Sequence, residues 1–198
     1  IGHDQRTPLT SLRIRSEGEE DEKRREAMIA TIDEMSLMLE DILALARRGQ
    51  AAGEREEVDL AQEAAAVLEE FDRQQERLRL VAREPVRAEA YPVLWRRALR
   101  NLIENGLRYG EVVTIIVCSA PGEARVIVDD DGPGVPEADL PNLREAFVRG
   151  EGSRNRTTGG AGLGLTLTDS VAAAHGGRLH LENRAEGGFR AVLTIPVA

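Results

Sequence analysis

Apolar residues recur at alternating steps of four and three along residues 28–46, and this spacing constrains the fold more than any other feature of the chain. They are Met28, Ile32, Met35, Leu39, Ile42 and Ala46. Such a stripe is typical of the a and d positions of helices that pack as coiled coils. One helical hairpin cannot bury the stripe alone, so we expect two copies of the chain to form a four-helix bundle, as a homodimer.

The first helix of this hairpin is predicted over residues 1–17. Pro8 has no backbone N–H and should kink the helix about one turn after His3. Gly18 and the highly charged residues 19–26 then separate the first helix from the second.

The chain is expected to contain two domains, an all-α domain at 1–50 and a second domain at 55–198. The helical pattern is already under way at the first residue without a capping residue, so we expect the all-α domain to be truncated at its N-terminus. Residues 47–57 are rich in Ala, Gly, Gln and charge without periodicity, which indicates a linker.

The second domain alternates helices with strands that are grouped as hairpins. Helices are predicted at 61–75, 91–109 and 162–175, and strands at 58–60, 78–81, 86–90, 112–119, 124–129, 179–182 and 191–196. The turn Ala120-Pro121-Gly122-Glu123 joins the two longest strand signals, and the last two strands are predicted to form a hairpin across Glu186-Gly187-Gly188. This grouping predicts an α+β sandwich rather than a parallel βαβ sheet.

Charge and composition exclude several classes of function. The chain has 35 Asp and Glu against 26 Lys and Arg, a formal net charge of -9 at pH 7, with its arginines scattered among acids. Nucleic-acid binding requires clustered cations, so no nucleic-acid partner is expected. The single cysteine, Cys118, cannot form an internal disulfide, which favours a reducing compartment. No apolar run approaches the roughly eighteen residues of a membrane span, so any membrane anchor would lie upstream.

His3 is followed at once by Asp4 and, four positions after the histidine, by Thr7. On a helix this spacing puts an imidazole and a hydroxyl on one face, beside an acid that could take a proton. The alternative is an ordinary surface histidine near the start of the chain.

Asn101, Asn105 and Arg108 fall on one face of the helix predicted over 91–109. Two amides and an arginine suit a hydrated divalent cation and phosphate oxygens, because Mg²⁺ takes hard oxygen ligands and keeps several waters. Alone, these residues could equally form an exposed polar face.

Three acids, Asp129, Asp130 and Asp131, end a predicted strand and run into a turn with Gly132 and Gly134. An aspartate at such a turn can accept a hydrogen bond from an exocyclic amine, and the glycines let the backbone approach a ligand closely. The alternative is an ordinary acidic turn.

Residues 146–160 carry Arg149, Arg154 and Arg156 amid small polar residues, which is typical of a mobile lid whose cations meet an anion. Glycines at every second position then open a helix, so that free N–H groups face a phosphate; they are Gly160, Gly162 and Gly164. The Rossmann pattern requires a strand directly before its glycines, and the Walker pattern requires Gly-Lys-Ser/Thr, so both fail here.

In their order and spacing these motifs strongly resemble those of the sensor histidine kinases of two-component signalling. The matching residues are His3-Asp4-Gln5-Arg6-Thr7-Pro8 for the H box, Asn101 to Asn105 for the N box, Asp130, Gly132 and Gly134 for the first glycine box, Phe147 for the F box, and Gly160, Gly162 and Gly164 for the second glycine box. The resemblance covers nearly the whole chain. It implies a dimerisation and phosphotransfer hairpin at 1–50, followed by a catalytic ATP-binding domain of the Bergerat type at 55–198.

The resemblance also implies a role for each matched residue. His3 would be the phosphoacceptor, Asp4 the base that polarises its imidazole, and Thr7 would orient water when the phosphorylated partner is dephosphorylated. Asn105 would coordinate Mg²⁺, and Asp130 would bind the adenine amine of ATP. The other nucleotide contacts would come from Asn101, Arg108, Tyr109, Gly132, Gly134, Phe147, Arg149, Gly160, Gly162, Leu163, Gly164 and Leu165.

Family resemblance implies autophosphorylation on a histidine, transfer to an aspartate of a response-regulator receiver domain, and a phosphatase activity toward that partner. It also implies the cytoplasmic portion of a sensor anchored in the inner membrane. Two alternatives stay open. One is an ATP hydrolase of the chaperone, gyrase and mismatch-repair type, although its water-activating glutamate would stand where this chain has Asn101. The other is a dimeric scaffold that only binds nucleotide.

Gln5 departs from the family, in which an apolar residue, commonly leucine, usually stands at this position. A buried amide without a partner costs about 1–3 kcal/mol. Gln5 therefore weakens the bundle, finds a partner across it, or records an engineered substitution. This departure concerns the competence of the dimerisation hairpin more than that of the ATP site.

Overall fold

The computed structural model describes residues 25, 54–143 and 164–197 of the 198-residue chain. The predicted helical hairpin and its four-helix bundle lie outside the described residues, apart from Arg25, and so does the predicted lid. The second predicted domain is the part that the structure describes.

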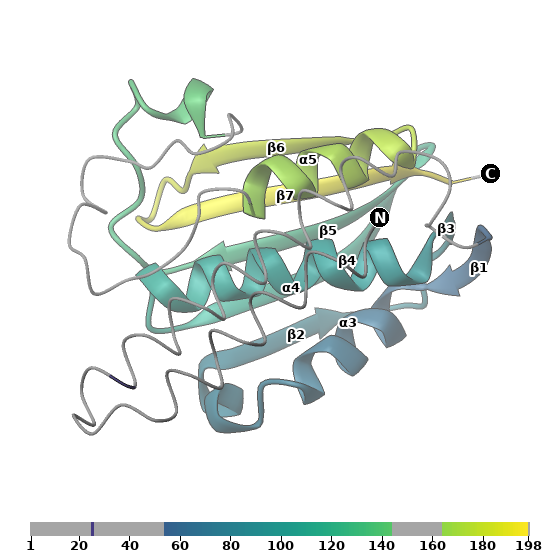
Figure 1. The fold of residues 1–198 in the computed structure, drawn as a ribbon, viewed down its shortest axis with the longest axis horizontal. Helices are drawn as coiled ribbons and strands as arrows, with labels where there is room; N and C mark the ends of the chain where they lie inside the picture. Colours follow the sequence, from purple (N-terminus) through teal and green to yellow (C-terminus); the bar gives the residue numbers. More distant parts are fainter. Residues whose placement is uncertain (1–24, 26–53, 144–163, 198) are drawn as a thin grey trace.

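A five-stranded sheet in the order β2-β4-β5-β7-β6 forms one layer of this domain (Figure 1). Its strands are β2 (Leu78–Ala82), β4 (Val113–Ala120), β5 (Glu123–Asp130), β6 (Arg178–Asn183) and β7 (Phe189–Pro196). The predicted hairpin pairings β4–β5 and β6–β7 are confirmed, and β5 also pairs antiparallel with β7. By contrast, β2 runs parallel to β4, because the chain between them passes through a helix and returns in the same direction.

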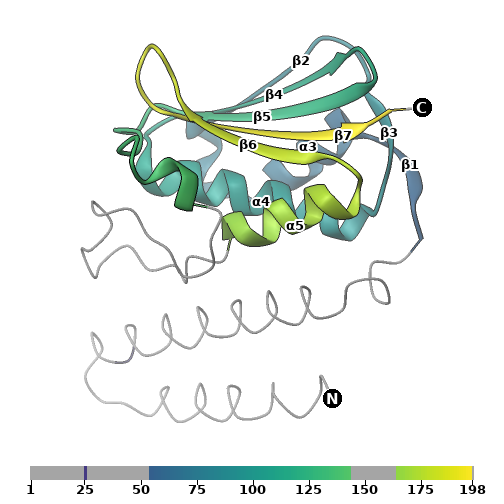
Figure 2. The same cartoon turned by 90° about the horizontal axis from the view of Figure 1, so that it is seen from above.

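Helices α3 (Leu60–Glu69), α4 (Pro92–Tyr109) and α5 (Gly164–Ala174) cover one face of the sheet (Figure 2). The predicted α+β sandwich is therefore confirmed for this part of the chain. Two short 3-10 helices are η1 (Asp72–Arg77) and η2 (Leu140–Asn142). Among the described helices, none combines the length and apolar character needed to cross a bilayer.

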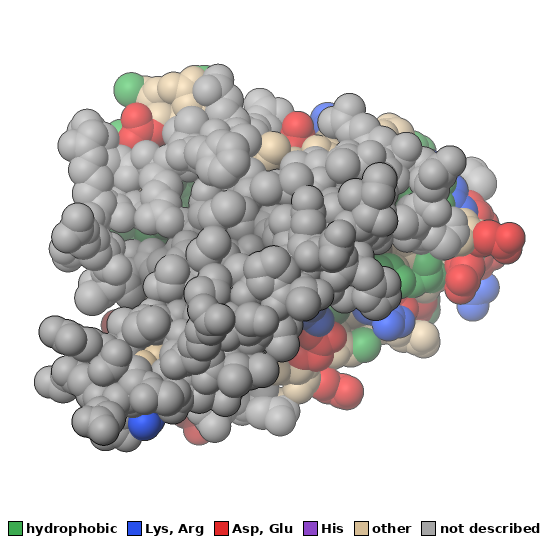
Figure 3. All heavy atoms as spheres, viewed as in Figure 1, with side chains coloured by type: hydrophobic (Ala, Val, Ile, Leu, Met, Phe, Trp, Pro, Cys, Tyr) green, Lys and Arg blue, Asp and Glu red, His purple; other side chains and the backbone are tan. Residues whose placement is uncertain are grey.

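A small antiparallel pair, β1 (Glu56–Asp59) and β3 (Arg87–Ala90), lies at one end of the domain. Arg87 Nη1 contacts Glu57 Oε1 across this pair at 3.2 Å. Acidic side chains gather at this end with a few basic ones among them (Figure 3). β1 begins two residues earlier than the predicted strand, inside the segment assigned to the linker.

Alternation along the central strands builds the core. The inward residues of β4 are Val113, Ile115 and Val117, those of β5 are Ala124, Val126 and Val128, and α4 covers them with Trp95, Ala98, Leu99, Leu102 and Ile103. Successive strand residues point to opposite faces, so the next inward position of β5 after Val128 is Asp130. The central strand β5 therefore ends with an acidic side chain, Asp130, on its buried face.

The helix predicted over 61–75 is wrong in its second half, because α3 ends at Glu69 and η1 follows. Asp59 fixes the start of α3, since its Oδ1 accepts a hydrogen bond from Ala61 N at 2.9 Å. Phe71 packs against the core, but the next six residues, Asp-Arg-Gln-Gln-Glu-Arg, offer no apolar side chain to hold a further α-helical turn there.

Arg77, at the end of η1, caps the C-terminus of α4. Its Nη2 donates to Leu107 O at 2.9 Å and to Gly110 O at 2.6 Å, and its Nε donates to Glu111 O at 2.8 Å. These are carbonyls that the helix itself leaves without partners. The cap fixes the end of α4 that approaches the three acids.

His175 lies at the other end of α4, where α5 terminates, and is 2% exposed. Its Nε2 accepts a hydrogen bond from Tyr91 N at 2.9 Å, and its Nδ1 lies 2.7 Å from Val171 O. The first contact requires a bare Nε2, so the proton resides on Nδ1 and the ring is neutral. Its ring packs edge-on against Tyr91 and Trp95, with centroids 5.3 Å and 6.1 Å away.

Candidate functional site

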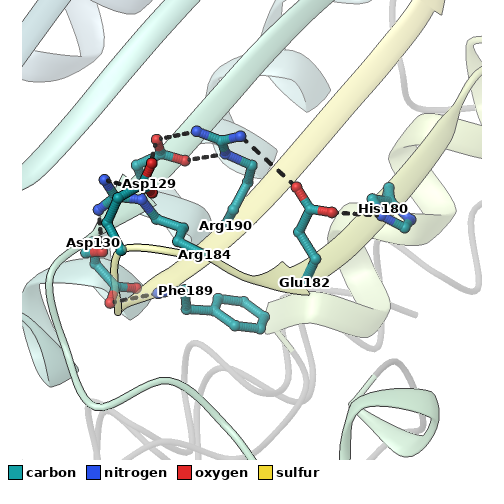
Figure 4. A network of polar contacts seen from close by, with 8 residues as sticks. Asp129, Asp130, His180, Glu182, Arg184, Phe189 and Arg190 are labelled. Carbon is teal, nitrogen blue, oxygen red and sulfur yellow. Dashed lines mark hydrogen bonds and ion pairs between the residues drawn. The ribbon is translucent and has the colours of Figure 1, made fainter. Parts of the chain in front are cut away.

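The three consecutive acids at the end of β5 have three different environments, two of which, those of Asp129 and Asp130, are drawn in Figure 4. Asp129 faces the outer side of the sheet, where Arg190 donates to both of its carboxylate oxygens at 2.7 Å. Asp131 follows the strand, and its Oδ1 accepts from Glu111 N at 2.7 Å and from Val112 N at 2.9 Å. These two acids are therefore engaged in holding the fold, and Asp130 is the one that faces the helix layer.

The Asp130 carboxylate is buried, with 4% of the residue exposed. Its Oδ1 accepts hydrogen bonds from Gly132 N at 2.9 Å and from Phe189 N at 3.3 Å. Among the described residues, none donates a hydrogen bond to Oδ2. Burial raises the pKa of Asp130, and the two backbone hydrogen bonds oppose this rise. A buried carboxylate with one uncommitted oxygen is suited to accept a hydrogen bond from a ligand.

The turn after Asp130 requires its two glycines. A Cβ on Gly132 would lie 2.7 Å from Tyr109 O, and Gly134 has φ +72° with its Cβ position 2.7 Å from Asn183 Oδ1. Asn183 holds the turn, because its Oδ1 accepts from Val135 N at 2.8 Å and its Nδ2 donates to Val135 O at 2.6 Å. The turn is therefore fixed between the end of α4 and the end of β6.

Asn101 connects α4 to the first residue of α5. Its Nδ2 donates to Gly164 O at 3.5 Å, and Thr168 Oγ1 donates to the same oxygen at 2.9 Å. Gly164 opens α5, and Leu165 packs against the core. The last glycine of the predicted phosphate-binding motif thus lies beside the first asparagine of the α4 motif.

Asn105 lies one turn further along α4 and is partly exposed, whereas Arg108 and Tyr109 are exposed near its C-terminus. An amide oxygen such as that of Asn105 is a suitable hard ligand for Mg²⁺. No group of three or more His, Cys, Asp or Glu side chains forms a metal site within residues 54–143 and 164–197.

A family model described as "Histidine kinase-, DNA gyrase B-, and HSP90-like ATPase" matches residues 90–198. The chain belongs to this family. The described residues form its ATP-binding domain, with the α+β fold of histidine kinase catalytic domains.

The relatives of the chain are sensor kinases. It is 35% identical over 196 residues to sensor histidine kinase GtrS of Pseudomonas aeruginosa, a match that covers 99% of this chain and 40% of that protein. The structure of full-length ShkA in complex with AMPPNP is 26% identical with a TM-score of 0.76, covering 100% of this chain and 44% of that one. The ATP-binding domain of PrrB from Mycobacterium tuberculosis is 28% identical with a TM-score of 0.59, covering 73% and 98% of the two chains. The chain spans about two fifths of the length of GtrS.

The structure brings together only part of the predicted histidine kinase site. Asn101 of α4 contacts Gly164 at the start of α5, and Asp130 and Gly132 lie against the C-terminal part of α4, which also carries Asn105, Arg108 and Tyr109. Leu165 follows Gly164 in α5, whereas Gly134 lies against Asn183 of β6 and Gly188. The remaining predicted residues lie outside the described residues; they are His3, Asp4, Thr7, Phe147, Arg149, Gly160, Gly162 and Leu163. Gln5 lies outside them as well.

Sequence reasoning missed the contribution of the β6–β7 turn to this site. Phe189 N donates to the Asp130 carboxylate, and a Cβ on Gly188 would lie 2.0 Å from Asp130 O. The Gly187-Gly188 pair in the sequence predicted a hairpin turn, but it did not predict a contact with Asp130. A turn residue that touches a distant strand end is a non-local contact, which spacing along the chain does not encode.

Proposed function

We propose that the protein is a histidine kinase that transfers the γ-phosphoryl group of ATP to His3 and then to an aspartate of a response-regulator receiver domain. It also dephosphorylates that partner. The observation that carries this proposal is the Asp130 carboxylate, buried beside a glycine turn with Oδ2 uncommitted among the described residues. Sensor histidine kinases among its relatives support the same reaction.

ATP fits the residues of this site. The exocyclic amine of adenine is a donor, and the largely buried Asp130 carboxylate presents an acceptor. Gly132 and Gly134 let the turn pack closely against Tyr109 and Asn183, which holds it beside Asp130. At the start of α5, backbone N–H groups and the positive end of the helix dipole would meet the phosphates.

Asn105 would hold Mg²⁺ through its amide oxygen, and Asn101 and Arg108 would contact the phosphates. Bound Mg²⁺ supplies neutralisation of the phosphate charge. The proposed nucleotide contacts are completed by Tyr109, Phe147, Arg149, Gly160, Gly162, Leu163, Gly164 and Leu165.

His3 accepts the phosphoryl group in this proposal, and Asp4 selects the imidazole tautomer with a bare nitrogen. Thr7 orients water in the reverse, phosphatase direction. The chain acts as a homodimer through the hairpin at 1–50, as the cytoplasmic portion of a sensor whose anchor lies upstream.

Hydrolysis of ATP by water is the less favoured chemistry. The position four residues before Asn105 holds Asn101, whose Nδ2 donates to Gly164 O. An amide side chain has no basic site with which to take a proton from water. Transfer to a histidine needs no base at this position.

The test is to incubate the chain with γ-labelled ATP and Mg²⁺. We expect an acid-labile label on the protein, absent from His3→Gln although that variant still binds nucleotide. Asp130→Asn should lose both binding and label. An acid-stable label, or a label that persists in His3→Gln, contradicts the proposal, and steady phosphate release without labelled protein supports the hydrolase instead.

A further inference from the structure

The turn between β6 and β7 closes directly onto Asp130 (Figure 4). Arg184 N donates to Gly188 O at 3.0 Å, and Gly187 N donates to Arg184 O at 3.1 Å, so the turn is a closed unit. Gly188 has φ +95°, and its Cβ position lies 2.0 Å from Asp130 O, so the turn backbone rests against the acid. The position of this turn therefore determines the position of Asp130.

Arg184 is the side chain that fastens the turn to the end of β5. Its Nη1 donates to Asp130 O at 2.9 Å, and its Nε lies 3.6 Å from Asp129 Oδ2. The side chain is 24% exposed, and the buried Nε makes no hydrogen bond with the described residues. Arg184 therefore contacts two groups of β5, the backbone carbonyl of Asp130 and the carboxylate of Asp129.

Arg190 fixes the carboxylate that attracts Arg184. Its guanidinium donates to both oxygens of Asp129 at 2.7 Å, so Asp129 cannot rotate toward solvent without losing two charge-assisted hydrogen bonds. Arg190 Nη1 also lies 3.8 Å from Glu182 Oε1, and Glu182 Oε2 lies 3.3 Å from His180 Nε2. The network therefore runs from the exposed face of β6 to the backbone of Asp130.

Arg184 also acts on the charge of the acid. Burial raises the pKa of Asp130 most, and the backbone hydrogen bonds from Gly132 and Phe189 lower it. Of the charged neighbours, Asp131 raises this pKa, and the positive charge of Arg184 lowers it and favours the ionised carboxylate, with the smallest effect of the five. One side chain therefore holds the backbone of Asp130 and supports the charged form of its carboxylate.

We infer that Arg184 is a positioning residue for nucleotide recognition, which fixes Asp130 from behind so that its free carboxylate oxygen meets the amine of adenine. This inference rests on the proposed ATP site. It adds a residue of the β6–β7 turn, absent from the motifs in the sequence, as a determinant of the preference for adenine.

The test compares ADP with IDP, which differ in that hypoxanthine has a carbonyl where adenine has its exocyclic amine. Titration calorimetry on the whole chain should show tighter binding of ADP than of IDP. Arg184→Met should weaken ADP binding about tenfold, because a charge-assisted hydrogen bond that positions the acceptor is lost, while IDP binding changes by less than about twofold. The ratio of the two dissociation constants is the readout.

The pH dependence of ADP binding distinguishes a role of Arg184 in positioning Asp130 from a general loss of structure. In Arg184→Met the loss of affinity on acidification should begin at a higher pH than in the wild type, because the charge that supports ionised Asp130 is gone. Arg184→Lys keeps the charge and should retain the wild-type pH profile with an intermediate affinity. Arg178→Met is the matched control, since Arg178 lies on β6, is 68% exposed and pairs with Glu123, away from the acid.

The outcomes distinguish this inference from the proposed function. If the wild type does not prefer ADP and Asp130→Asn changes nothing, the proposed adenine contact itself fails. If Asp130→Asn abolishes the preference but Arg184→Met keeps it, only the role of Arg184 is overturned. Equal losses of ADP and IDP affinity in Arg184→Met and Arg184→Lys also overturn it, because they indicate a structural role alone.

Discussion

The two ends of the α4–α5 layer each bury a titratable side chain, and the two are satisfied to different degrees. At one end both nitrogens of His175 are engaged, by Tyr91 N–H and the Val171 carbonyl, and the ring is neutral. At the other end, both hydrogen bonds that the described residues donate to the Asp130 carboxylate go to Oδ1. Burial lowers the pKa of His175 and raises that of Asp130, so both shifts disfavour the charged form.

This difference separates a polar group whose hydrogen-bond partners all lie within the fold from one with an oxygen that the described residues leave open. A fully bonded buried group adds specificity to the core without further partners. A largely buried carboxylate with an oxygen that the described residues leave open is suited to accept a hydrogen bond from a ligand. Variants at the two ends should therefore change stability and binding in different proportions.

The largest effect on stability is expected at the Asp130 end, from Gly188→Ala. A Cβ there would lie 2.0 Å from Asp130 O at φ +95°. Urea denaturation should show a loss of about 3–4 kcal/mol in the free energy of unfolding, because clash and backbone strain combine, and ADP should bind more weakly.

Gly187→Ala is the matched control for this change. Gly187 has a similar φ of +94°, but nothing lies within 4 Å of its Cβ position. It should cost only about 1–2 kcal/mol from backbone strain, with ADP binding retained. If both variants lost the same free energy of unfolding, the close approach of Gly188 to Asp130 would not contribute to the loss in Gly188→Ala.

At the opposite end, His175→Phe should lower the free energy of unfolding by about 2–3 kcal/mol, because the Tyr91 N–H is left buried without its acceptor. Nucleotide affinity should stay unchanged, since the change lies at the far end of α4. Denaturation and calorimetry on the same preparation check this. Weaker ADP binding with intact stability would reverse the assigned roles of the two ends.

Asparagine substitutions of the adjacent acids Asp130 and Asp131 should have opposite effects on ADP affinity and on melting temperature. Asp130→Asn should weaken ADP binding about tenfold to a hundredfold, as expected for a lost hydrogen bond to a charged group. Its melting temperature should not fall, because burial already penalises the ionised carboxylate. Asp131→Asn should instead lower the melting temperature and keep ADP affinity, because backbone hydrogen bonds from Val112 and Glu111 lower the pKa of Asp131. Similar profiles for the two variants would contradict the division of roles.

Acidification should weaken the His175 end. Burial lowers the folded-state pKa of His175 from its ordinary value of 6.5, so the unfolded chain binds the proton more readily. This contribution to stability is complete above pH 6.5 and is lost as pH falls toward the folded-state pKa, by at most about 1.4 kcal/mol per pH unit. The difference between wild type and His175→Phe, measured across this range, isolates it; a difference that grows on acidification would contradict the sign.

The smallest effect is expected for Arg55→Met. The Arg55 guanidinium lies 5.2 Å from the centre of the Tyr91 ring, and its Nη2 donates to Ala174 O at 2.6 Å. Loss of these exposed contacts should cost about 0.5–1 kcal/mol. Urea denaturation measures it, and a loss as large as that of His175→Phe would show that the ring contact, rather than the buried hydrogen bonds, holds this end.

Local sequence patterns predicted most helices and strands of this domain, whereas features that depend on long-range contacts were not predicted. Strand signals located β4 and β5 within one position at each end, and the apolar face of residues 91–109 located α4. The parallel pairing of β2 could not be predicted, because it depends on how the chain returns after a helix.

The candidate site divides in the same way. Asp130, Gly132 and Gly134 form one contiguous motif, so the sequence indicated them together. Arg184 contacts β5 from 54 positions away, and an arginine beside a hairpin turn has no distinctive local pattern. Prediction therefore worked for groups that the chain brings together locally and failed for groups that only the folded sheet brings together.

The register of the β4–β5 hairpin has a further consequence. The pairing runs from Ala120 opposite Glu123 to Val113 opposite Asp130 without interruption. Strand side chains alternate between faces, so the number of residues after the turn decides which of the three acids points inward. Deleting one residue from β5 before Asp129 would turn Asp130 toward the outer face and bring in a neighbouring acid. The length of a strand therefore determines which carboxylate faces the helix layer.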